Sequence, residues 1–504
     1  MSISSVHDVV VIGGGFSGIG AAIKLDRAGF RDLLILEEGS GVGGAWHWNT
    51  YPGVAVDIPS FSYQFSFEQR ADWSRIYAPG AELKAYAEHC TDKYRLRDRL
   101  HLNTKVIGAN FDEDTHVWQI EAVDGRVFQA RNIVMATGAL TQPKPPAIAG
   151  LDDFAGTIVH TARWNPDLDL RGKRVGVIGT GASAVQLVPS IAPDVDQLVV
   201  FQRTPIWCLP KLDGPLPKPV RAMLANIPGA RRAARLASQA YVEVGFPVTA
   251  HFSGQIPAAS VMERVGKAFL RREVSDPVVR EKLTPRHAIG CKRPSFSNDY
   301  LTAFNLPQVQ LETAGIEKIT ERGIRTVDGT EHEFDVLVLA TGFKVFEAGN
   351  MPPFPVTVGT RDLERWWDER RYQAYQGVSV PGFPNFFLIT GPYGYNGSSY
   401  FNLIEVQSRH ITRCLEHARK LGTTRIEISE AANTRYWQRM LGRRGGQVFY
   451  LTDCSGTNSY YFDKHGDVPF RPSLTVETMW ESATFDLDDY QYSVVGADKV
   501  TADA

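Results

Sequence analysis

The sequence predicts an α/β protein with two dinucleotide-binding, Rossmann-like domains and a helical insertion. Two stretches favour this fold class, since each is a short apolar run followed by a glycine-rich turn, a helix-like segment and a second apolar run. Strand, glycine turn, helix and strand in this order form a βαβ unit that binds a dinucleotide. A chain of 504 residues is also too long for one hydrophobic core, so two or three domains are expected.

The first glycine turn follows DVVVI, residues 8–12, an apolar run typical of a parallel strand that is buried on both faces. The next residues read GGGFSG, in which Gly13, Gly15 and Gly18 have the spacing GxGxxG. The first glycine permits a tight turn, the second lets a pyrophosphate approach the backbone, and the third lets the helix pack on the strand. We expect a helix over residues 19–29.

The second glycine turn repeats this pattern. RVGVIG, residues 174–179, is a predicted strand and turn, and Gly179, Gly181 and Ala184 give the spacing GxGxxA. The run QLVVFQR, residues 197–203, is the strand expected after the helix. The chain is therefore predicted to contain two dinucleotide folds.

The residues at the second strand of each unit distinguish the two nucleotides. Glu37 and Arg203 lie equally far along the chain from Gly13 and Gly179, so they should occupy equivalent strand ends. A carboxylate at this position accepts hydrogen bonds from free ribose hydroxyls, whereas a guanidinium suits a 2′-phosphate. We therefore predict FAD at the first site and NADPH at the second.

Two further apolar runs that close in Ala-Thr-Gly mark where the chain crosses between the nucleotide domains. They are ARNIVMATGA, residues 130–139, and FDVLVLATGF, residues 334–343, and they bracket the second glycine turn. This nesting predicts an FAD-binding domain of residues 1–149 and 338–504, an NADPH-binding domain of residues 150–209 and 290–337, and a helical insertion of residues 210–289.

Composition excludes several classes of protein. The formal net charge is -2, so there is no basic surplus for binding nucleic acid. No run of eighteen apolar residues occurs, and the basic helical pattern of residues 231–235 is expected to face solvent, so no stable membrane insertion is expected. The first glycine turn leaves no room for a cleavable signal, so a cytoplasmic location is expected.

The cysteines are far apart, with no CxxC and no paired spacing, which favours a reducing compartment and predicts neither a metal site nor a disulfide. They are Cys90, Cys208, Cys291, Cys414 and Cys454. The missing CxxC also excludes a disulfide reductase.

Several motifs together resemble the flavin-containing Baeyer-Villiger monooxygenases of the single-chain, FAD- and NADPH-dependent type I. The stretch FAGTIVHTARW fits the family fingerprint FxGxxxHxxxW with Phe154, Gly156, His160 and Trp164. GGAWHWNTYPGVAVD, residues 43–57, fits a second pattern, and CKRPSFSNDYLTAFN, residues 291–305, and FQRTP, residues 201–205, resemble two more. The chain departs from the family at Asn165 and at Ser459-Tyr460-Tyr461, where a Ser-Trp pair is usual.

The resemblance implies insertion of one oxygen atom from O2 beside a ketone carbonyl, through a peroxide on carbon 4a of the flavin, to give an ester or lactone. Arg293 is the expected counter-charge for the anionic oxygens, because a guanidinium stays protonated and offers several donors. Asp57 is expected to pair with it. Lys292 is expected to bind the 2′-phosphate together with Arg203 and Thr204.

The partners implied are a small ketone and O2, and the chain is expected to be a monomer or a weak homodimer. His160 is expected to make hydrogen bonds that set the position of a linker rather than to act as a base, and Trp164 to pack that linker. The full set of expected cofactor contacts is Gly13, Gly15, Phe16, Gly18, Glu37, Gly44, Trp46, Tyr51, Asp57, Tyr63, Gly179, Thr180, Gly181, Ala182, Ser183, Arg203, Thr204, Lys292, Ala340, Thr341 and Gly342.

Two other functions remain open at this point. A flavin monooxygenase that oxygenates sulfur or nitrogen is the nearest, although those enzymes usually carry Phe or Tyr in place of Trp164. The other is a redox-sensing protein that binds FAD and NADPH without catalysis.

Overall fold

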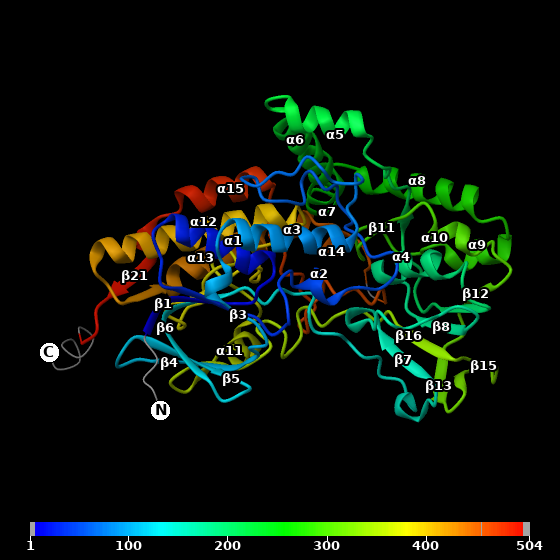
Figure 1. Ribbon diagram of the computed structural model, residues 1–504, viewed down its shortest axis with the longest axis horizontal. Helices are drawn as coiled ribbons and strands as arrows, with labels where there is room; N and C mark the ends of the chain where they lie inside the picture. Colours follow the sequence, from blue (N-terminus) through cyan, green and yellow to red (C-terminus); the bar gives the residue numbers. More distant parts are fainter. Residues whose placement is uncertain (1–5, 455, 497–504) are drawn as a thin grey trace.

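The computed structural model describes residues 6–454 and 456–496. The N-terminal and C-terminal thirds of the described chain belong to one lobe, drawn in blue to cyan and in yellow to red on the left of Figure 1. The middle of the chain forms a second lobe, drawn in teal to yellow-green on the right, and helices α5 and α6 project above the two.

The first lobe is built on a nine-stranded sheet in the order β18-β17-β4-β5-β6-β1-β2-β3, with β19 also paired to β6. Strands β2, β6 and β1 run parallel, whereas β4, β5 and β6 form an antiparallel meander. The bounds are β1 Val6–Ile12, β2 Leu33–Leu36, β3 Leu100–His101, β4 Val106–Asp112, β5 Val117–Ala122, β6 Val127–Met135, β17 Val356–Val358, β18 Arg361–Asp362 and β19 Phe386–Leu388.

The apolar run of β1 serves two cores, as expected of a strand covered on both faces. Val9 and Val11 belong to one buried cluster, and Val10 and Ile12 to another on the opposite face. The alternation follows from the two-residue period of a strand. Every side chain from Val9 to Ile12 is therefore needed for packing.

The second lobe contains a five-stranded sheet, ordered β12-β9-β8-β16-β7, in which every pair is parallel. A three-stranded antiparallel sheet, β13-β14-β15, lies between β12 and β16 in the sequence. The bounds are β7 Thr157–His160, β8 Arg174–Ile178, β9 Gln197–Phe201, β12 Val309–Glu312, β13 Ile316–Thr320, β14 Gly323–Thr326, β15 Glu331–Glu333 and β16 Val336–Leu339. The predicted α/β fold class with two dinucleotide-binding units is confirmed.

Helices cover both sheets. In the first lobe, α1 packs on the long helix α12, which ends at Gly422 in the left-handed conformation with φ +67°. The bounds there are α1 Phe16–Arg27, α2 Ala45–Trp48, α3 Gly80–Lys93, α11 Leu363–Arg370, α12 Tyr400–Leu421, α13 Glu430–Arg443, α14 Val448–Leu451 and α15 Thr475–Thr484, with a small sheet of β20 Arg425–Ile428 and β21 Tyr490–Ser493. The second lobe has α4 Ala182–Ile191 and α10 Tyr300–Ala303, and short 3-10 turns are η1 Arg97–Arg99, η2 Leu151–Asp153, η3 Thr161–Arg163, η5 Arg444–Gly446 and η6 Leu487–Asp489.

Residues 210–289 form helices within the part of the chain that the structure describes. They are α5 Lys218–Asn226, α6 Ala230–Glu243, the π-helical turn η4 Val244–Val248, α7 Thr249–His251, α8 Ala258–Glu273 and α9 Pro277–Leu283. The expectation that the basic face of residues 231–235 is solvated is wrong at Arg235. Its guanidinium is 12% exposed and donates to Gln64 O at 2.6 Å and to Asn402 Oδ1 at 3.0 Å, because α6 lies against the first lobe.

Among the described residues, no helix is both long enough and apolar enough to cross a membrane.

The predicted limits of the FAD-binding domain, the NADPH-binding domain and the helical insertion remain a prediction. The crossing strands β6 and β16 belong to the first and second sheet respectively.

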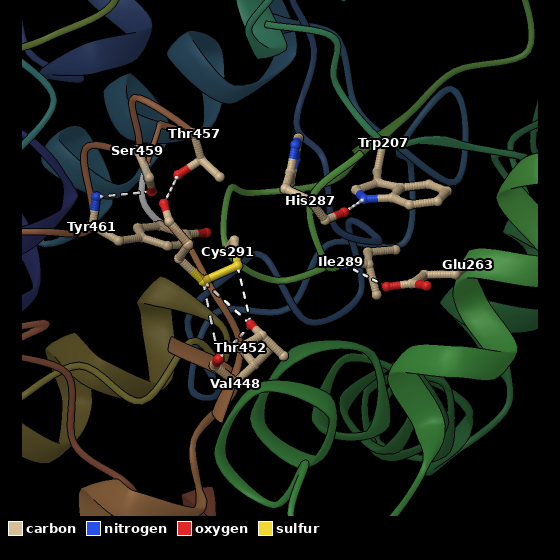
Figure 2. Close-up of a disulfide and its surroundings, with 11 residues drawn as sticks. Trp207, Glu263, His287, Ile289, Cys291, Val448, Thr452, Thr457, Ser459 and Tyr461 are labelled. Atoms are coloured by element: carbon tan, nitrogen blue, oxygen red, sulfur yellow. Dashed lines mark hydrogen bonds between the residues drawn. A yellow bond between two sulfur atoms is a disulfide. The ribbon is translucent and has the colours of Figure 1, made fainter. Parts of the chain in front are cut away.

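The expectation that the cysteines form no disulfide is wrong. Cys291 and Cys454 are joined by a disulfide, with their Cα atoms 5.3 Å apart (Figure 2). The two cysteines are 163 residues apart in sequence, so their spacing gave no sign of the pairing. Cys90, Cys208 and Cys414 are free and buried, and burial raises the pKa of each thiol to about 12.

Candidate active site

The first glycine turn forms a cradle in which backbone segments approach one another closely. A Cβ atom at Gly13, where φ is +114°, would lie 2.5 Å from Ala136 O, and one at Gly18 would overlap Gly13 O. A Cβ at Gly15 would lie 3.3 Å from the Cα of Gly44. Gly15 precedes α1 and has no side chain to cap it, so the first N–H groups of the helix point at the place that a pyrophosphate takes.

Glu37 lies at the end of β2 beside this turn, as predicted. It is 6% exposed, and its carboxylate accepts from Gly14 N at 2.5 Å and from Gly39 N at 2.6 Å. Burial raises the pKa of Glu37, while these two N–H groups oppose the rise. A carboxylate oxygen has further lone pairs, so Glu37 can also accept from ribose hydroxyls. The cradle and this acid fit the FAD that the sequence predicts.

Aromatic residues of the predicted set gather at the N-terminus of α1. Trp46 Nε1 donates to the Tyr63 hydroxyl at 3.1 Å, and the Phe16 ring lies edge-on to Tyr63 with centroids 6.3 Å apart. The hydroxyl of Tyr400, the first residue of α12, lies 2.9 Å from Ser17 Oγ. The start of α12 therefore meets the start of α1.

The second glycine turn reproduces the first. A Cβ at Gly179, where φ is +113°, would lie 2.5 Å from Ala340 O, which parallels the contact of Gly13 with Ala136. A Cβ at Gly181 would meet no atom within 4 Å, so the space before Ala182 and Ser183 is open to a ligand. Thr180 Oγ1 donates to Thr204 O at 2.9 Å and links this turn to the segment after β9. The geometry fits a second dinucleotide.

Lys292 and Arg203 come together as two cations at this second turn. The short parallel strands β10 (Cys208–Leu209) and β11 (Ser295–Phe296) bring their segments side by side. Burial and then the charge of Arg203 lower the pKa of Lys292 to about 8. No salt bridge joins either cation to an acid within the described part of the chain. Two unopposed cations suit a dianionic phosphate.

Arg293 and Asp57 form the ion pair that the resemblance implies. Nε of Arg293 donates to Asp57 Oδ2 at 2.7 Å, Nη2 lies 2.6 Å from the same oxygen in the ion pair, and the two side chains are 27% and 34% exposed. Burial opposes the charge of Arg293, but the charge of Asp57, followed by Tyr461 and Tyr395, raises its pKa well above the usual value. A permanent cation therefore lies at a partly exposed position against the Asp57 loop, which leads from Gly44, beside the first glycine turn, and is held by Gln186 of α4.

The loop that carries Asp57 is held by α4, the helix that begins at the second glycine turn. The Tyr51 hydroxyl donates to Gln186 Oε1 at 2.9 Å, and Gln186 Nε2 donates to Ala55 O at 2.9 Å. A Cβ at Gly53, where φ is +81°, would overlap the Ser190 hydroxyl and lie 2.5 Å from Gln186 O. Gln186 was missed by sequence reasoning, although it is a polar residue within the apolar helix ASAVQLVPSI.

We expect Gly53→Ala to destabilise the protein more than Gly125→Ala. Both glycines have positive φ, +81° and +83°, but a Cβ at Gly125 would meet nothing within 4 Å. Alanine is therefore strained at both positions by the backbone conformation, but only at Gly53 does its Cβ also clash with α4. We expect this clash to lower the free energy of unfolding by about a further 1–3 kcal/mol. Urea denaturation of the two variants measures the difference, and equal losses would show that the loop does not press on α4.

The fingerprint residues form a joint between the two crossing segments. His160 Nδ1 accepts from Ala162 N at 3.1 Å, and its Nε2 lies 3.3 Å from Thr341 Oγ1, which donates to Lys144 O at 2.6 Å. Burial lowers the pKa of His160 to about 4, so the ring is neutral at pH 7 and a poor base. His160 therefore has hydrogen-bonding contacts on both sides of its ring, and its role in positioning the linker stays a prediction.

The other fingerprint side chains pack. Trp164 is 8% exposed and belongs to the core of the second lobe together with Tyr51 and Val159, as predicted. A Cβ at Gly156 would lie 2.6 Å from the Phe154 ring and 2.7 Å from Asp335 O, so only glycine fits there. Gly342, the glycine of the second Ala-Thr-Gly run, also has a positive φ, +85°.

Within residues 6–454 and 456–496, no three His, Cys, Asp or Glu side chains are grouped to hold a metal ion.

These features define a class of protein: an oxidoreductase with two dinucleotide sites joined by a partly exposed arginine-aspartate pair. The family model described as pyridine nucleotide-disulphide oxidoreductase matches residues 10–207. A Baeyer-Villiger monooxygenase of Streptomyces coelicolor is 36% identical over 99% of this chain and 96% of that protein, and one of Pseudomonas aeruginosa is 36% identical over 89% and 86%.

Solved structures agree with these relatives. A steroid monooxygenase bound to NADP matches with a TM-score of 0.86 and 31% identity, and a closed form of cyclohexanone monooxygenase with 0.86 and 27%. Each match covers 97% of this chain and all of the other. The chain belongs to the Baeyer-Villiger monooxygenase family.

Proposed function

We propose that the protein uses FAD and NADPH to insert one oxygen atom from O2 beside the carbonyl of a small ketone, giving an ester or lactone. The observation that carries the proposal is the Arg293-Asp57 pair, which is partly open to solvent and whose Asp57 loop is held by the helix of the second glycine turn. The family membership and the FAD and NADP complexes among its structural relatives support the choice of cofactors.

Bound FAD, once reduced by NADPH, supplies the activation of oxygen that no side chain can provide. Arg293 contributes positive charge where negative charge develops on the substrate oxygen, in the manner of an oxyanion hole. Asp57 fixes the guanidinium through Nε and Nη2, which leaves the remaining N–H groups for the oxyanion. Gln186 holds the Asp57 loop on α4, the helix that begins at the proposed NADPH site. The position of the Arg293-Asp57 pair therefore depends on that site.

Tyrosine hydroxyls surround the guanidinium. Tyr395 and Tyr461 interact electrostatically with Arg293, and burial raises the pKa of each, so they are neutral at pH 7. Tyr460, which is 37% exposed, also interacts with Arg293. Neutral hydroxyls offer hydrogen bonds without competing with Asp57 for the positive charge. Two of these tyrosines, Tyr460 and Tyr461, belong to the segment in which the family usually carries a Ser-Trp pair.

The test is product analysis with the purified holoenzyme. Incubation with NADPH, a panel of linear, cyclic and aryl ketones, and a thioether should give esters or lactones from at least one ketone. Sulfoxide alone would contradict the proposal and favour a monooxygenase of sulfur and nitrogen. Binding of both nucleotides without any oxygenated product would favour a redox sensor.

NADPH binding should weaken as the pH rises through about 8, because the Lys292 pKa lies there. Below pH 8 the ammonium is charged and attracts the 2′-phosphate, and above pH 8 it loses its proton. The KM for NADPH should therefore rise on the alkaline side, whereas the KM for NADH, which lacks this phosphate, should stay level. Lys292→Arg should abolish the rise for NADPH, since arginine stays charged. A parallel rise for NADH would refute the assignment.

The same proposal includes a cytoplasmic protein that is a monomer or a weak homodimer. A cytoplasmic location is supported by its use of NADPH, a reductant of that compartment. Sedimentation analysis of the holoenzyme tests the oligomeric state, and a stable tetramer would contradict it.

A further inference from the structure

We propose that Cys291 and Cys454 are a thiol-disulfide exchange site that controls how tightly NADPH consumption is coupled to ester formation. The effect on coupling rests on the proposed function. The exchange itself and the local opening that it causes do not depend on that function.

The disulfide is built into the candidate active site. Cys291 directly precedes Lys292 and Arg293, and Cys454 lies in the loop that leads to Tyr460 and Tyr461 (Figure 2). Both tyrosines interact electrostatically with the Arg293 guanidinium. The bond therefore ties the Arg293 segment to the loop of these tyrosines.

Apart from the Arg293-Asp57 pair, three neighbouring hydrogen bonds hold the Arg293 segment to Trp207 and Glu263 of the second lobe. Trp207 Nε1 donates to His287 O at 2.8 Å, Ile289 N donates to Glu263 Oε1 at 3.0 Å, and Ser295 N donates to Trp207 O at 2.8 Å. These contacts hold the chain on either side of Lys292 and Arg293 to β10 and α8. The disulfide is the covalent connection between this segment and the loop of the tyrosines.

The surroundings of the bond differ from those of the free cysteines. Cys454 follows three exposed residues, Leu451 to Asp453, whereas Cys90 and Cys414 lie in the middle of buried helices. Thr452 Oγ1 lies 3.4 Å from Cys291 Sγ and 3.5 Å from Cys454 Sγ. Its hydroxyl can donate to a thiolate that leaves either position. The two cysteines are themselves buried, with Cys291 0% and Cys454 7% exposed, so a reductant would reach Cys454 from the side of these exposed residues. A polar neighbour and an exposed adjoining segment favour exchange there.

The exchange balances with a dithiol as reductant. One thiolate of the dithiol attacks Cys454 Sγ, the bond between the cysteines breaks, and Cys291 leaves as a thiolate. The second thiolate of the dithiol then attacks the mixed disulfide and releases Cys454, and both cysteines take up protons while the reductant becomes a disulfide. In the reverse direction, hydrogen peroxide takes two electrons and two protons from the two thiols and becomes two waters.

A disulfide that forms reversibly suits a cytoplasmic enzyme, since the disulfides of that compartment are usually transient and redox-sensing. The oxidised state holds the Lys292-Arg293 segment against the tyrosine loop. Reduction removes this tie from the residues expected to bind NADPH and to stabilise the oxyanion. We therefore expect the reduced enzyme to have a higher KM for NADPH and to form less ester per NADPH consumed, with the difference appearing as hydrogen peroxide.

The experiment compares the holoenzyme equilibrated in oxidising and in reducing dithiothreitol buffers. Alkylation and mass spectrometry report the state of Cys291 and Cys454. Chymotrypsin cleavage after Tyr460, which is 37% exposed, should become several-fold faster on reduction. The ratio of ester to NADPH should fall at least twofold in the same sample.

Two variants make the result specific. Cys454→Ser should show the reduced behaviour in both buffers, and Cys90→Ala, which alters a free and buried thiol, should respond like the wild type. Wild-type enzyme that resists reduction while folded, or that is reduced without any change in cleavage or coupling, would overturn the proposal. A change in cleavage without any ester in either state would mean that the proposed function fails while the exchange site remains.

Discussion

Arg293→Ala is expected to lower kcat for ester formation by about 10²–10³-fold, the loss seen when one oxyanion donor is removed, while the enzyme still binds FAD. The variant removes the guanidinium that Asp57 holds. The FAD cradle consists of Gly13, Gly15 and Glu37, none of which bonds to Arg293. Flavin absorbance of the purified variant and ester yield per enzyme measure the two properties separately.

The matched control is Arg97→Ala. Arg97 is also paired with carboxylates, those of Glu88 and Asp92, but it lies in η1 and its guanidinium bonds to neither glycine turn. It should leave ester formation close to the wild-type rate. Asp57→Asn should give an intermediate loss, because the guanidinium remains but is no longer oriented. An unchanged yield from Arg293→Ala would refute the role assigned to this residue.

Arg203→Ala is expected to reduce the preference for NADPH over NADH by about 2 kcal/mol, the free energy of one charge-assisted contact, which is roughly 30-fold in the ratio of kcat/KM values. Arg203 is exposed just after β9, the second strand of the NADPH-binding βαβ unit, and lies near Lys292. NADH has no 2′-phosphate, so its use should hardly change. Steady-state kinetics with both nucleotides give the ratio.

Arg171→Ala is the control for this prediction. Arg171 is exposed in the same lobe and pairs with Asp169 before β8. Its loss should affect both nucleotides little. If Arg203→Ala lowered kcat/KM for NADPH and for NADH equally, Arg203 would not bind the 2′-phosphate.

The glycine turns and their strands could be predicted because their signals are local. Gly13 and Gly179 follow apolar strands directly, and both have positive φ and abut the carbonyl of an alanine in a crossing segment. The Ala-Thr-Gly runs were recognisable for the same reason, although their contacts with the turns come from the fold. The helical nature of residues 210–289 was also predicted, since no strand pattern interrupts them.

Contacts between distant segments were out of reach of local patterns. The pairing of Arg293 with Asp57 followed from a family resemblance, since the two residues are far apart in the chain. Gln186 fits a helix equally well whether it faces solvent or the Asp57 loop, and Arg235 gave no sign of its contact with Gln64. Cysteine spacing likewise pointed away from the Cys291-Cys454 bond.

The most direct test of the central claim is the fate of oxygen during turnover under ¹⁸O2. The holoenzyme is supplied with NADPH and one ketone that it converts, and the product is analysed by mass spectrometry. We predict one ¹⁸O atom per molecule, located in the new ester linkage, and almost none with Arg293→Ala. NADPH consumption that yields hydrogen peroxide and unlabelled ketone for every ketone tested would contradict the account.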